Sequence, residues 1–192
     1  MNKIIAAYAG TGKTHFASLY PELTIDLVSM PYKYLLSKKA PYNESSKANP
    51  ENIPNDDWPF NYISTIKQNL ESGKILLIPS DFLILRLLRE ENLHYCLCYP
   101  QRNDKENYRE RYLRRGNSSE FIDIFIGEWD KFMDYFEKDS YGQHIVLQTD
   151  QFLSDVIDMP PKMPIRKQNS AKDGSKNLPN LEVKISQIRA TV

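Results

Sequence analysis

Residues 10–14, Gly-Thr-Gly-Lys-Thr, restrict the fold of this chain more than any other stretch. They follow an apolar run at residues 3–8 and open a segment at 13–19 with a helical pattern. Glycine adopts backbone conformations that other residues avoid, so the chain can curl here and direct successive amides inward. A strand, a glycine turn and a helix in this order predict an α/β protein.

Four further apolar runs predict the remaining strands of one sheet. With the first they span residues 3–8, 24–28, 75–78, 94–99 and 144–148. None alternates cleanly between polar and apolar residues, which is typical of strands covered on both faces. Helical patterns at 13–19, 61–71, 81–91 and 119–137 separate them, and Asn117 with Glu120 is expected to cap the last helix. Strands that alternate with helices predict a parallel sheet with right-handed crossovers.

Two segments do not fit this pattern. Residues 38–57 are rich in Lys, Asn, Ser and Pro, so residues 38–60 are expected to form a mobile loop beside the substrate. Residues 159–192 are polar and basic and are expected to form a tail that is ordered only if it docks on something. The first 158 residues are therefore predicted to be one domain.

The net charge and the hydropathy of the chain argue against nucleic acid and membranes as general partners. The chain has 25 basic and 25 acidic residues, whereas a general nucleic-acid coat usually carries a positive excess. Nucleic acid would be expected only at the tail, through Arg166, Lys167, Lys172 and Lys176. No apolar run reaches the roughly 18 residues of a membrane span, so no membrane contact and a cytoplasmic location are expected. Cys96 and Cys98 are expected to be small core residues.

The segment at residues 7–14, which we call the glycine loop, fits the phosphate-binding pattern G-x-x-x-x-G-K-[ST] except that Ala7 replaces the first glycine. In this pattern backbone amides surround phosphate oxygens, the lysine reaches the β- and γ-phosphates, and the hydroxyl binds Mg²⁺. The residues expected to hold the nucleotide are Ala9, Gly10, Thr11, Gly12, Lys13, Thr14 and His15. The alternative is a glycine turn that only caps a helix.

Two acidic residues are candidates for the same site. Asp81 follows the third apolar run, where it could hold Mg²⁺ or cap the next helix. Asp26 lies inside the second apolar run and would be costly to bury without a partner. We expect Asp26 to contact substrate hydroxyls, an amine or Mg²⁺, unless its strand is an edge strand that turns it to solvent.

Arginines cluster between residues 101 and 116. In a helix Arg111 and Arg115 would share a face, with Arg114 beside them. Such a cluster suits a phosphoryl group in transfer, whereas the alternative is a solvated face paired with Glu106 and Glu110. Arg86 lies in an apolar helical segment and is expected to grip the acceptor's phosphate or to pair with a structural acid.

With these motifs, residues 1–158 resemble the nucleoside monophosphate kinase-like branch of P-loop proteins, in particular short phage- or mobile-element-type nucleotide kinases. The resemblance implies a three-layer α/β/α P-loop NTPase fold with a five-stranded parallel sheet in the order 2-3-1-4-5, and a small arginine-bearing lid at 101–116. It implies ATP and Mg²⁺ as cofactors and a nucleotide, in first place a nucleoside monophosphate, as acceptor. Carried over, Lys13, Arg111 and Arg115 stabilise the transferring group, Thr14 and Asp81 hold Mg²⁺, and Asp26, Arg86, Arg102 and Arg114 face the acceptor.

Departures from this family leave the acceptor open. No Asp-Gly-Phe-Pro-Arg string follows the third run, as it does in adenylate kinases, and thymidylate-kinase signatures are missing. The alternative is an NTP-binding or ATPase module that transfers no phosphoryl group to a small molecule and whose tail binds a partner. A polynucleotide kinase is disfavoured by the neutral charge.

Overall fold

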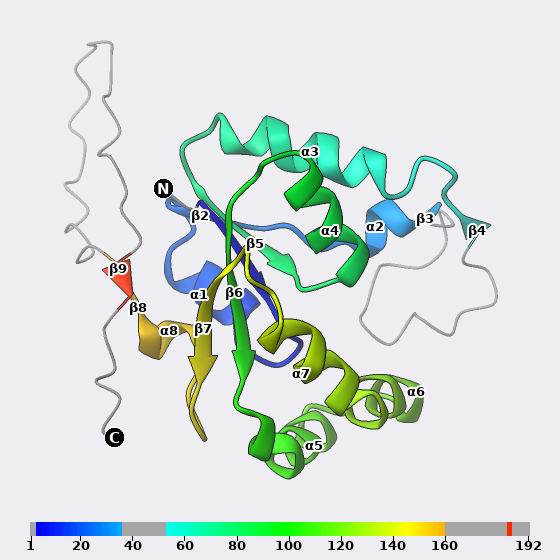
Figure 1. Cartoon of the computed structure of the whole chain (residues 1–192), viewed down its shortest axis with the longest axis vertical. Coiled ribbons are helices and arrows are strands. Elements are labelled where there is room, and N and C mark those ends of the chain that lie inside the picture. Colours follow the sequence, from blue (N-terminus) through cyan, green and yellow to red (C-terminus); the bar gives the residue numbers. More distant parts are fainter. Residues whose placement is uncertain (1–2, 36–52, 160–183, 186–192) are drawn as a thin grey trace, which may run out of the picture.

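A five-stranded parallel sheet forms the centre of the protein (Figure 1). The structure, a computed structural model, describes residues 3–35, 53–159 and 184–185. In spatial order the strands are β2 (Thr24–Asp26), β5 (Ile75–Pro79), β1 (Ile4–Ala7), β6 (Tyr95–Pro100) and β7 (Gln143–Leu147), and every neighbouring pair is parallel. The α/β class and the parallel sheet that the apolar runs predict are confirmed.

The numbering of the strand order depends on two strands that lie between β2 and β5 in the sequence but outside the sheet. Numbered along the chain it is 2-5-1-6-7, which differs from the implied 2-3-1-4-5. β3 (Tyr34–Leu35) and β4 (Ile53–Pro54) fall between β2 and β5 in the sequence and pair antiparallel with each other. Counted among the five sheet strands alone, the order reads 2-3-1-4-5. The order reverses at β1, and ligands of such sheets bind where it reverses, beyond the carboxyl ends of the strands.

Helices cover both faces of the sheet. α3 (Phe60–Leu70), α4 (Phe82–Glu90) and α7 (Trp129–Glu137) pack on the face to which Ile4 and Ala6 point. The other face carries α1 (Lys13–Leu19) and α8 (Leu153–Val156), which pack against Ile5 and Ala7. Successive strand residues therefore enter different layers, as the twofold period of a strand requires.

Both cysteines lie in the layer of α1 and α8, which confirms that they are core residues. Cys96 and Cys98 are buried and form no disulfide. Burial raises the pKa of the Cys98 thiol to about 12. A thiol that stays protonated is a poor nucleophile, so this residue contributes packing and not chemistry.

The single helix expected at 119–137 is wrong, because the segment is broken into three pieces. These are α6 (Ser119–Ile122), a π-helical turn η3 (Asp123–Gly127) and α7. Ser118, and not Asn117, caps α6 by accepting a hydrogen bond from the Phe121 amide. The Tyr8 hydroxyl donates to the Phe125 carbonyl inside the π turn at 2.5 Å, a contact 117 residues apart in sequence. A local helical pattern cannot predict a hydrogen bond to a residue so distant in the sequence.

The remaining elements flank the sheet. α2 (Met30–Lys33) follows β2, and the 3-10 turn η2 (Arg102–Asp104) with α5 (Lys105–Arg114) follows β6. Of the loop expected at 38–60, residues 38–52 lie outside the described residues, while 53–60 form β4, a turn and the start of α3. The tail lies outside them too, apart from Met159 and β9 (Lys184–Ile185), which pairs antiparallel with β8 (Ile157–Asp158). Within residues 3–35 and 53–159, no helix is both long and apolar enough to cross a bilayer.

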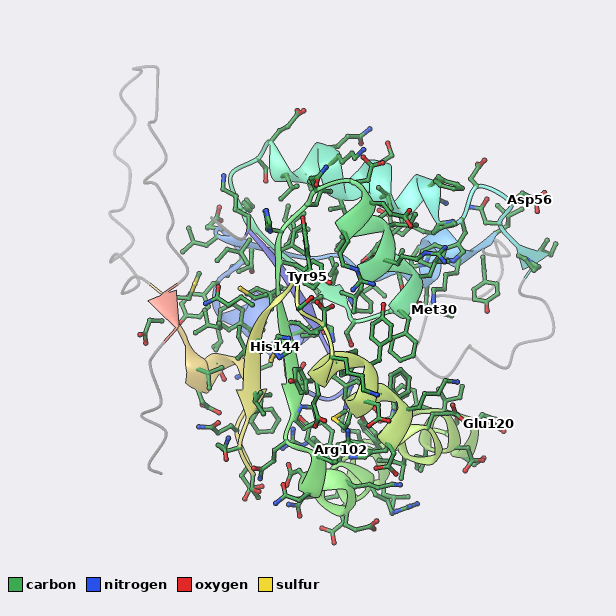
Figure 2. All side chains as sticks on the ribbon, viewed as in Figure 1. Met30, Asp56, Tyr95, Arg102, Glu120 and His144 are labelled. Carbon is green, nitrogen blue, oxygen red and sulfur yellow. The ribbon has the colours of Figure 1, made fainter. Side chains whose placement is uncertain are left out.

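A buried carboxylate holds the turn between α7 and β7 on the edge of the sheet. Asp139 accepts hydrogen bonds from the Tyr95 hydroxyl at 2.6 Å and from Arg89 at 2.9 Å (Figure 2 labels Tyr95). The amides of Tyr141 and Gly142 donate to the same side chain, each at 2.9 Å. Burial opposes the charge of Asp139, but these hydrogen bonds and the Arg89 charge outweigh it and lower the pKa of the carboxyl below its ordinary value.

Replacing Asp139 by alanine should lower the free energy of unfolding by about 3 kcal/mol, because several donors lose their acceptor at once. Urea denaturation measures this change. The matched control is Asp130→Ala, whose side chain is 70% exposed in its ion pairs and should change the free energy by no more than about 0.5 kcal/mol.

The pH dependence of the free energy of unfolding is a second test of the role of Asp139. Since the folded pKa of Asp139 lies below the unfolded value of about 3.9, its contribution is complete above that pH and is lost as the pH falls through the folded pKa. The free energy of unfolding of the alanine variant should therefore fall less steeply than that of the wild type as the pH is lowered. A variant that declines as steeply as the wild type would show that Asp139 does not carry this charge.

Candidate functional site

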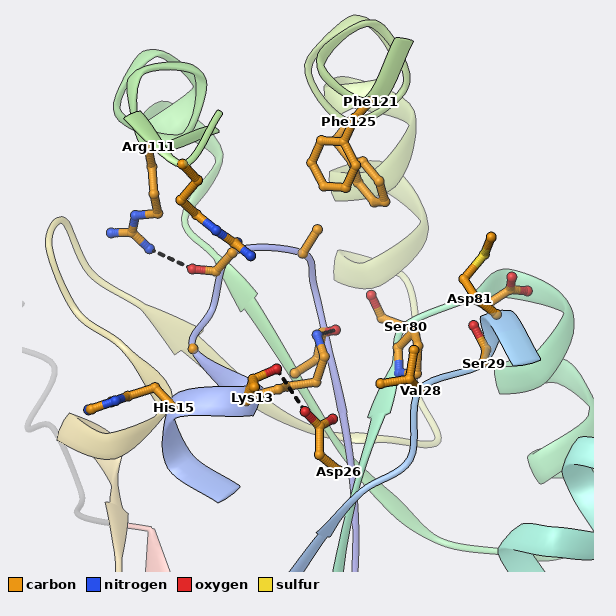
Figure 3. Close-up of a pocket in the computed structure, with 18 of the residues that line it drawn as sticks. Lys13, His15, Asp26, Val28, Ser29, Ser80, Asp81, Arg111, Phe121 and Phe125 are labelled. Carbon is orange, nitrogen blue, oxygen red and sulfur yellow. Dashed lines mark hydrogen bonds between the residues drawn. The ribbon is translucent and has the colours of Figure 1, made fainter. Parts of the chain in front are cut away.

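A pocket of about 1010 Å³ opens at the carboxyl ends of β1, β2 and β5 (Figure 3). Its walls come from the glycine loop, from the segment after β2, from the start of α4, from α5, and from α6 with the π turn η3. Asp150 and Phe152, which follow β7, complete it. The pocket therefore lies at the edge where the strand order reverses.

Two glycines shape the loop at the base of this pocket. Gly10 and Gly12 have positive φ angles of 79° and 92°, which disfavour any other residue. A Cβ atom at Gly10 would lie only 2.8 Å from the Tyr112 ring. Gly10 is thus required by its own conformation and by the helix α5 that covers it.

Donors hold each carbonyl of the loop from Ala7 to Gly12. The Lys13 ammonium donates to the carbonyls of Ala7 and Tyr8 at 2.6 and 3.0 Å. From α5, the Tyr112 hydroxyl donates to the Ala9 carbonyl and Arg111 donates to the Gly10 carbonyl, each at 2.9 Å. Backbone amides bind the last two carbonyls, that of Leu153 at Thr11 (2.9 Å) and that of Phe16 at Gly12 (2.8 Å). A trans peptide points its carbonyl and the next amide in opposite directions. An anion-binding curve needs its carbonyls turned away from the anion, and these bonds supply that restraint.

Thr11 differs from its neighbours in the loop. Its side chain is fully buried, and its hydroxyl donates to the Tyr8 carbonyl at 2.8 Å. It does not line the pocket, whereas Ala9, Gly10, Gly12, Lys13, Thr14 and His15 all do. The Thr11 hydroxyl therefore braces the loop and is not presented to the pocket.

Thr14 and Asp26 meet at the mouth of the loop. The Thr14 hydroxyl donates to the Asp26 carboxylate at 2.7 Å (Figure 3). Asp26 ends the edge strand β2 and is half-buried, facing the pocket. β2 is an edge strand, as the solvent alternative requires, but Asp26 lines the pocket and accepts a hydrogen bond there.

Asp81 caps a helix, as one of its two expected roles requires. Its carboxylate accepts from the Leu83 and Ile84 amides at the start of α4 and from the Lys33 ammonium at 2.7 Å. It lines the pocket on the side away from Lys13 and Asp26 (Figure 3). The carboxylate bonded to Thr14 is that of Asp26, whereas Asp81 bonds Lys33 and the start of α4.

The arginines of α5 divide into two kinds. Arg111 and Arg115 both line the pocket, as their spacing predicts, and Arg114 joins them. The Arg111 guanidinium lies 4.5 Å from the Tyr108 ring and 4.2 Å from the Phe152 ring while it donates to Gly10. Arg111 therefore positions the loop, whereas Arg114 and Arg115 are exposed at the pocket.

Arg86 and Arg102, both expected to face the acceptor, lie outside the pocket. Arg86 is 61% exposed and pairs with Glu90 one turn along α4, whose other side is buried. Arg102, which Figure 2 labels, binds Asp134 and Glu137 of α7 at 2.5 and 2.7 Å on the surface. In each case the guanidinium pairs with a nearby carboxylate, which for Arg86 was the alternative expectation.

An aromatic wall, which the sequence did not assign to the site, faces the glycine loop. It consists of Phe121, Phe125 and Phe132, with Ile124 beside them. All of them belong to the segment 119–137 that was expected to form one helix, and the π turn within it contributes Ile124 and Phe125 to the pocket. π turns are frequent at functional sites, but no sequence signal located this one.

The pocket therefore has two halves. We call the glycine loop with Arg111, Arg114 and Arg115 the loop half. The aromatic half comprises Ser29, Met30, Lys33, Asp81, Phe121, Ile124, Phe125 and Phe132. Among the described lining residues, five are lysine or arginine and three are aspartate, so the pocket is positive within a neutral chain.

Comparisons with known proteins add no assignment. No protein-family model matches this chain, and no curated protein matches it. What the pocket binds has to be inferred from its residues.

Proposed function

We propose that the protein is an ATP- and Mg²⁺-dependent phosphotransferase, a kinase, that acts on a nucleotide or a similar small molecule. The observation that carries this proposal is the Thr14–Asp26 hydrogen bond beside Lys13, at the mouth of a loop whose carbonyls from Ala7 to Gly12 all accept hydrogen bonds. Its catalytic domain would be residues 1–158, with the segment 101–116 as the arginine-bearing lid.

The glycine loop and Lys13 would bind the triphosphate. In the structure the Lys13 ammonium donates to the carbonyls of Ala7 and Tyr8. A hydrogen bond from an ammonium to an ionised phosphate is stronger than one to a neutral carbonyl. Lys13 is therefore expected to leave these carbonyls for the β- and γ-phosphates when ATP enters.

Thr14 and Asp26 fit a magnesium ion. Both offer hard oxygen atoms, and Mg²⁺ usually takes only one or two protein ligands in addition to water and phosphate oxygens. The Thr14 hydroxyl gives its proton to Asp26, which leaves its lone pairs for a cation. When bound, the ion would neutralise charge on the β- and γ-phosphate oxygens.

Arg114 and Arg115 would complete the charge around the transferring phosphoryl group. Both reach the pocket from the carboxyl end of α5, which lies over the glycine loop through the contacts of Arg111 and Tyr112. Charge on the transferring oxygens needs fixed cations at that point. Arg111 would act as a positioning residue for the loop.

Replacing Asp26 by asparagine tests the proposal at the observation that carries it. The Mg²⁺ concentration for half-maximal activity should rise about 10–100-fold, because the carboxylate no longer orients Thr14 or attracts the ion. A titration of activity with Mg²⁺ at saturating ATP measures this shift. Asp56→Asn, an exposed change outside the pocket, is the matched control.

Calorimetry with a non-hydrolysable ATP analogue and Mg²⁺ measures binding without turnover. Wild type should bind, and the asparagine variant should bind more weakly in Mg²⁺ than the control. If wild type does not bind the analogue, the phosphotransferase proposal is wrong.

A further inference from the structure

We propose, resting on the phosphotransferase function above, that the acceptor is a neutral nucleoside and not a nucleoside monophosphate. The aromatic half carries this inference. It combines an apolar wall with carboxylate and hydroxyl oxygens, and it holds little free positive charge to meet a second phosphate.

Of the three arginines expected to face the acceptor, Arg86 and Arg102 lie outside the described pocket and Arg114 lies in its loop half. Arg86 and Arg102 are bound to acids elsewhere. Lys33 is the one lysine or arginine of the aromatic half, and its ammonium is 2.7 Å from Asp81 and 4.8 Å from the centre of the Trp58 ring. Its charge is thus already matched by a carboxylate.

A monophosphate would find no unmatched cation in the aromatic half. It carries a charge of about −2 at neutral pH, whereas the one ammonium of this half, that of Lys33, is paired with the Asp81 carboxylate. Moving a charge out of water without a matching partner disfavours binding. A neutral acceptor avoids this cost.

The wall suits a flat, apolar ring. Phe125 and Phe132 are nearly parallel, with an interplanar angle of 12° and ring centres 5.7 Å apart, and Phe121 lies 4.4 Å from Phe125. The π turn brings Ile124 to the pocket, where it is 46% exposed. Aromatic and aliphatic surface left open in a pocket favours a ligand with an apolar ring face.

The opposite side of the same half offers hydrogen-bond acceptors. Asp81 and Ser29 face the pocket across from Phe121 and Phe125 (Figure 3). Carboxylates accept hydrogen bonds from hydroxyl and amino groups. A nucleoside presents both a ring face and sugar hydroxyls, so its chemistry matches the two sides of the half.

The transfer balances with ATP as the donor. A hydroxyl oxygen of the nucleoside bonds to the γ-phosphorus, and the bond from that phosphorus to the β–γ bridging oxygen breaks. The electron pair stays on the oxygen of ADP, and the hydroxyl proton is released to water. The products are a nucleoside monophosphate and ADP.

A product assay decides between the two acceptors. The full chain is incubated with ATP and Mg²⁺ and with each common ribonucleoside, deoxyribonucleoside and corresponding monophosphate, and products are identified by liquid chromatography and mass spectrometry. At least one nucleoside should gain a phosphoryl group at a kcat/KM well above that of its monophosphate. Phosphorylation of monophosphates alone, or no product from any nucleoside while the ATP analogue binds, would overturn the nucleoside inference. Failure of the ATP analogue to bind would instead overturn the phosphotransferase function.

Ile124→Arg tests the wall in the same assay. The position is exposed enough to accept arginine without unfolding, so the variant places a charge against the ring site. The KM for the nucleoside should rise about tenfold or more, while the KM for ATP stays within about twofold. Arg86→Ala, on the outer side of α4, is the control and should match the wild type. An unchanged nucleoside KM in Ile124→Arg would remove the aromatic wall from the acceptor site.

Discussion

Lys13→Ala should lower kcat/KM for ATP by about 1000-fold, the loss expected when a charged donor at the reacting group is removed. Lys13 is the lysine of the glycine loop, and its ammonium already lies within reach of the loop's own carbonyls, 2.6 Å from that of Ala7. The alanine side chain cannot reach the phosphates. Steady-state kinetics with the acceptor at saturation measure the change.

Two controls separate chemistry from folding in this variant. Lys13 also braces the loop, so its thermal unfolding has to be compared with that of the wild type. Lys67→Ala removes a lysine of an exposed ion pair with Glu91 and should leave activity unchanged. If Lys13→Ala folds normally and keeps its rate, the loop does not bind the reacting phosphates.

Arg115→Ala should reduce kcat by about 1000-fold, in the range that a transition-state arginine contributes. Arg115 lines the pocket at the carboxyl end of α5, above the loop. Charge spreads over the phosphoryl oxygens only during transfer, so the loss is expected in turnover and not in affinity. Single-turnover rates and calorimetry with the ATP analogue measure the two quantities separately.

Arg109→Ala is the matched control on the same helix. Arg109 pairs with Glu106, is 43% exposed and does not line the pocket, so its removal should leave kcat unchanged. A fall in ATP affinity with turnover preserved in Arg115→Ala would assign this arginine to ground-state binding. A fall of equal size in both variants would point to damage to α5 as a whole.

The sheet and most of its helices were predictable because their signals are local. Uniformly apolar runs mark strands buried on both faces, and these runs correspond to β1, β2, β5, β6 and β7. The helix expected at 13–19 has the same bounds in the structure, and Asp81 caps α4. Each of these features depends on neighbouring residues, which a sequence displays directly.

The break at residues 123–127 shows where local signals end. An aromatic residue every three or four positions fits a continuous helix, yet the structure inserts a π turn there. The Phe125 carbonyl accepts from Tyr8, whose ring contacts Phe125, Phe132 and Phe136 in the core. The packing of a distant residue outweighs the helical pattern, and the same turn forms part of the pocket wall.

Assignments within the site divide in the same way. The spacing of Arg111 and Arg115 placed both on one side of α5, but the rings of Tyr108 and Phe152 and the Gly10 carbonyl determine what Arg111 does. The apolar segment around Arg86 left two roles open, the acceptor's phosphate or a structural acid, and in the structure Arg86 falls on the outer side of α4 next to Glu90. A charge in an apolar segment can be placed only when the buried side of the helix is known.

By itself the sequence determined the class of the fold and the curl of the glycine loop, because strand periodicity and the φ angles open to glycine are properties of a few adjacent residues. Only the tertiary structure decided which groups meet at that loop. Thr14 donates its hydrogen bond to Asp26 and not to Asp81, and the Gly10 carbonyl accepts one from Arg111, which is 101 positions away. Such pairs are selected by the packing of helices on the sheet, and that packing is a property of the whole folded chain.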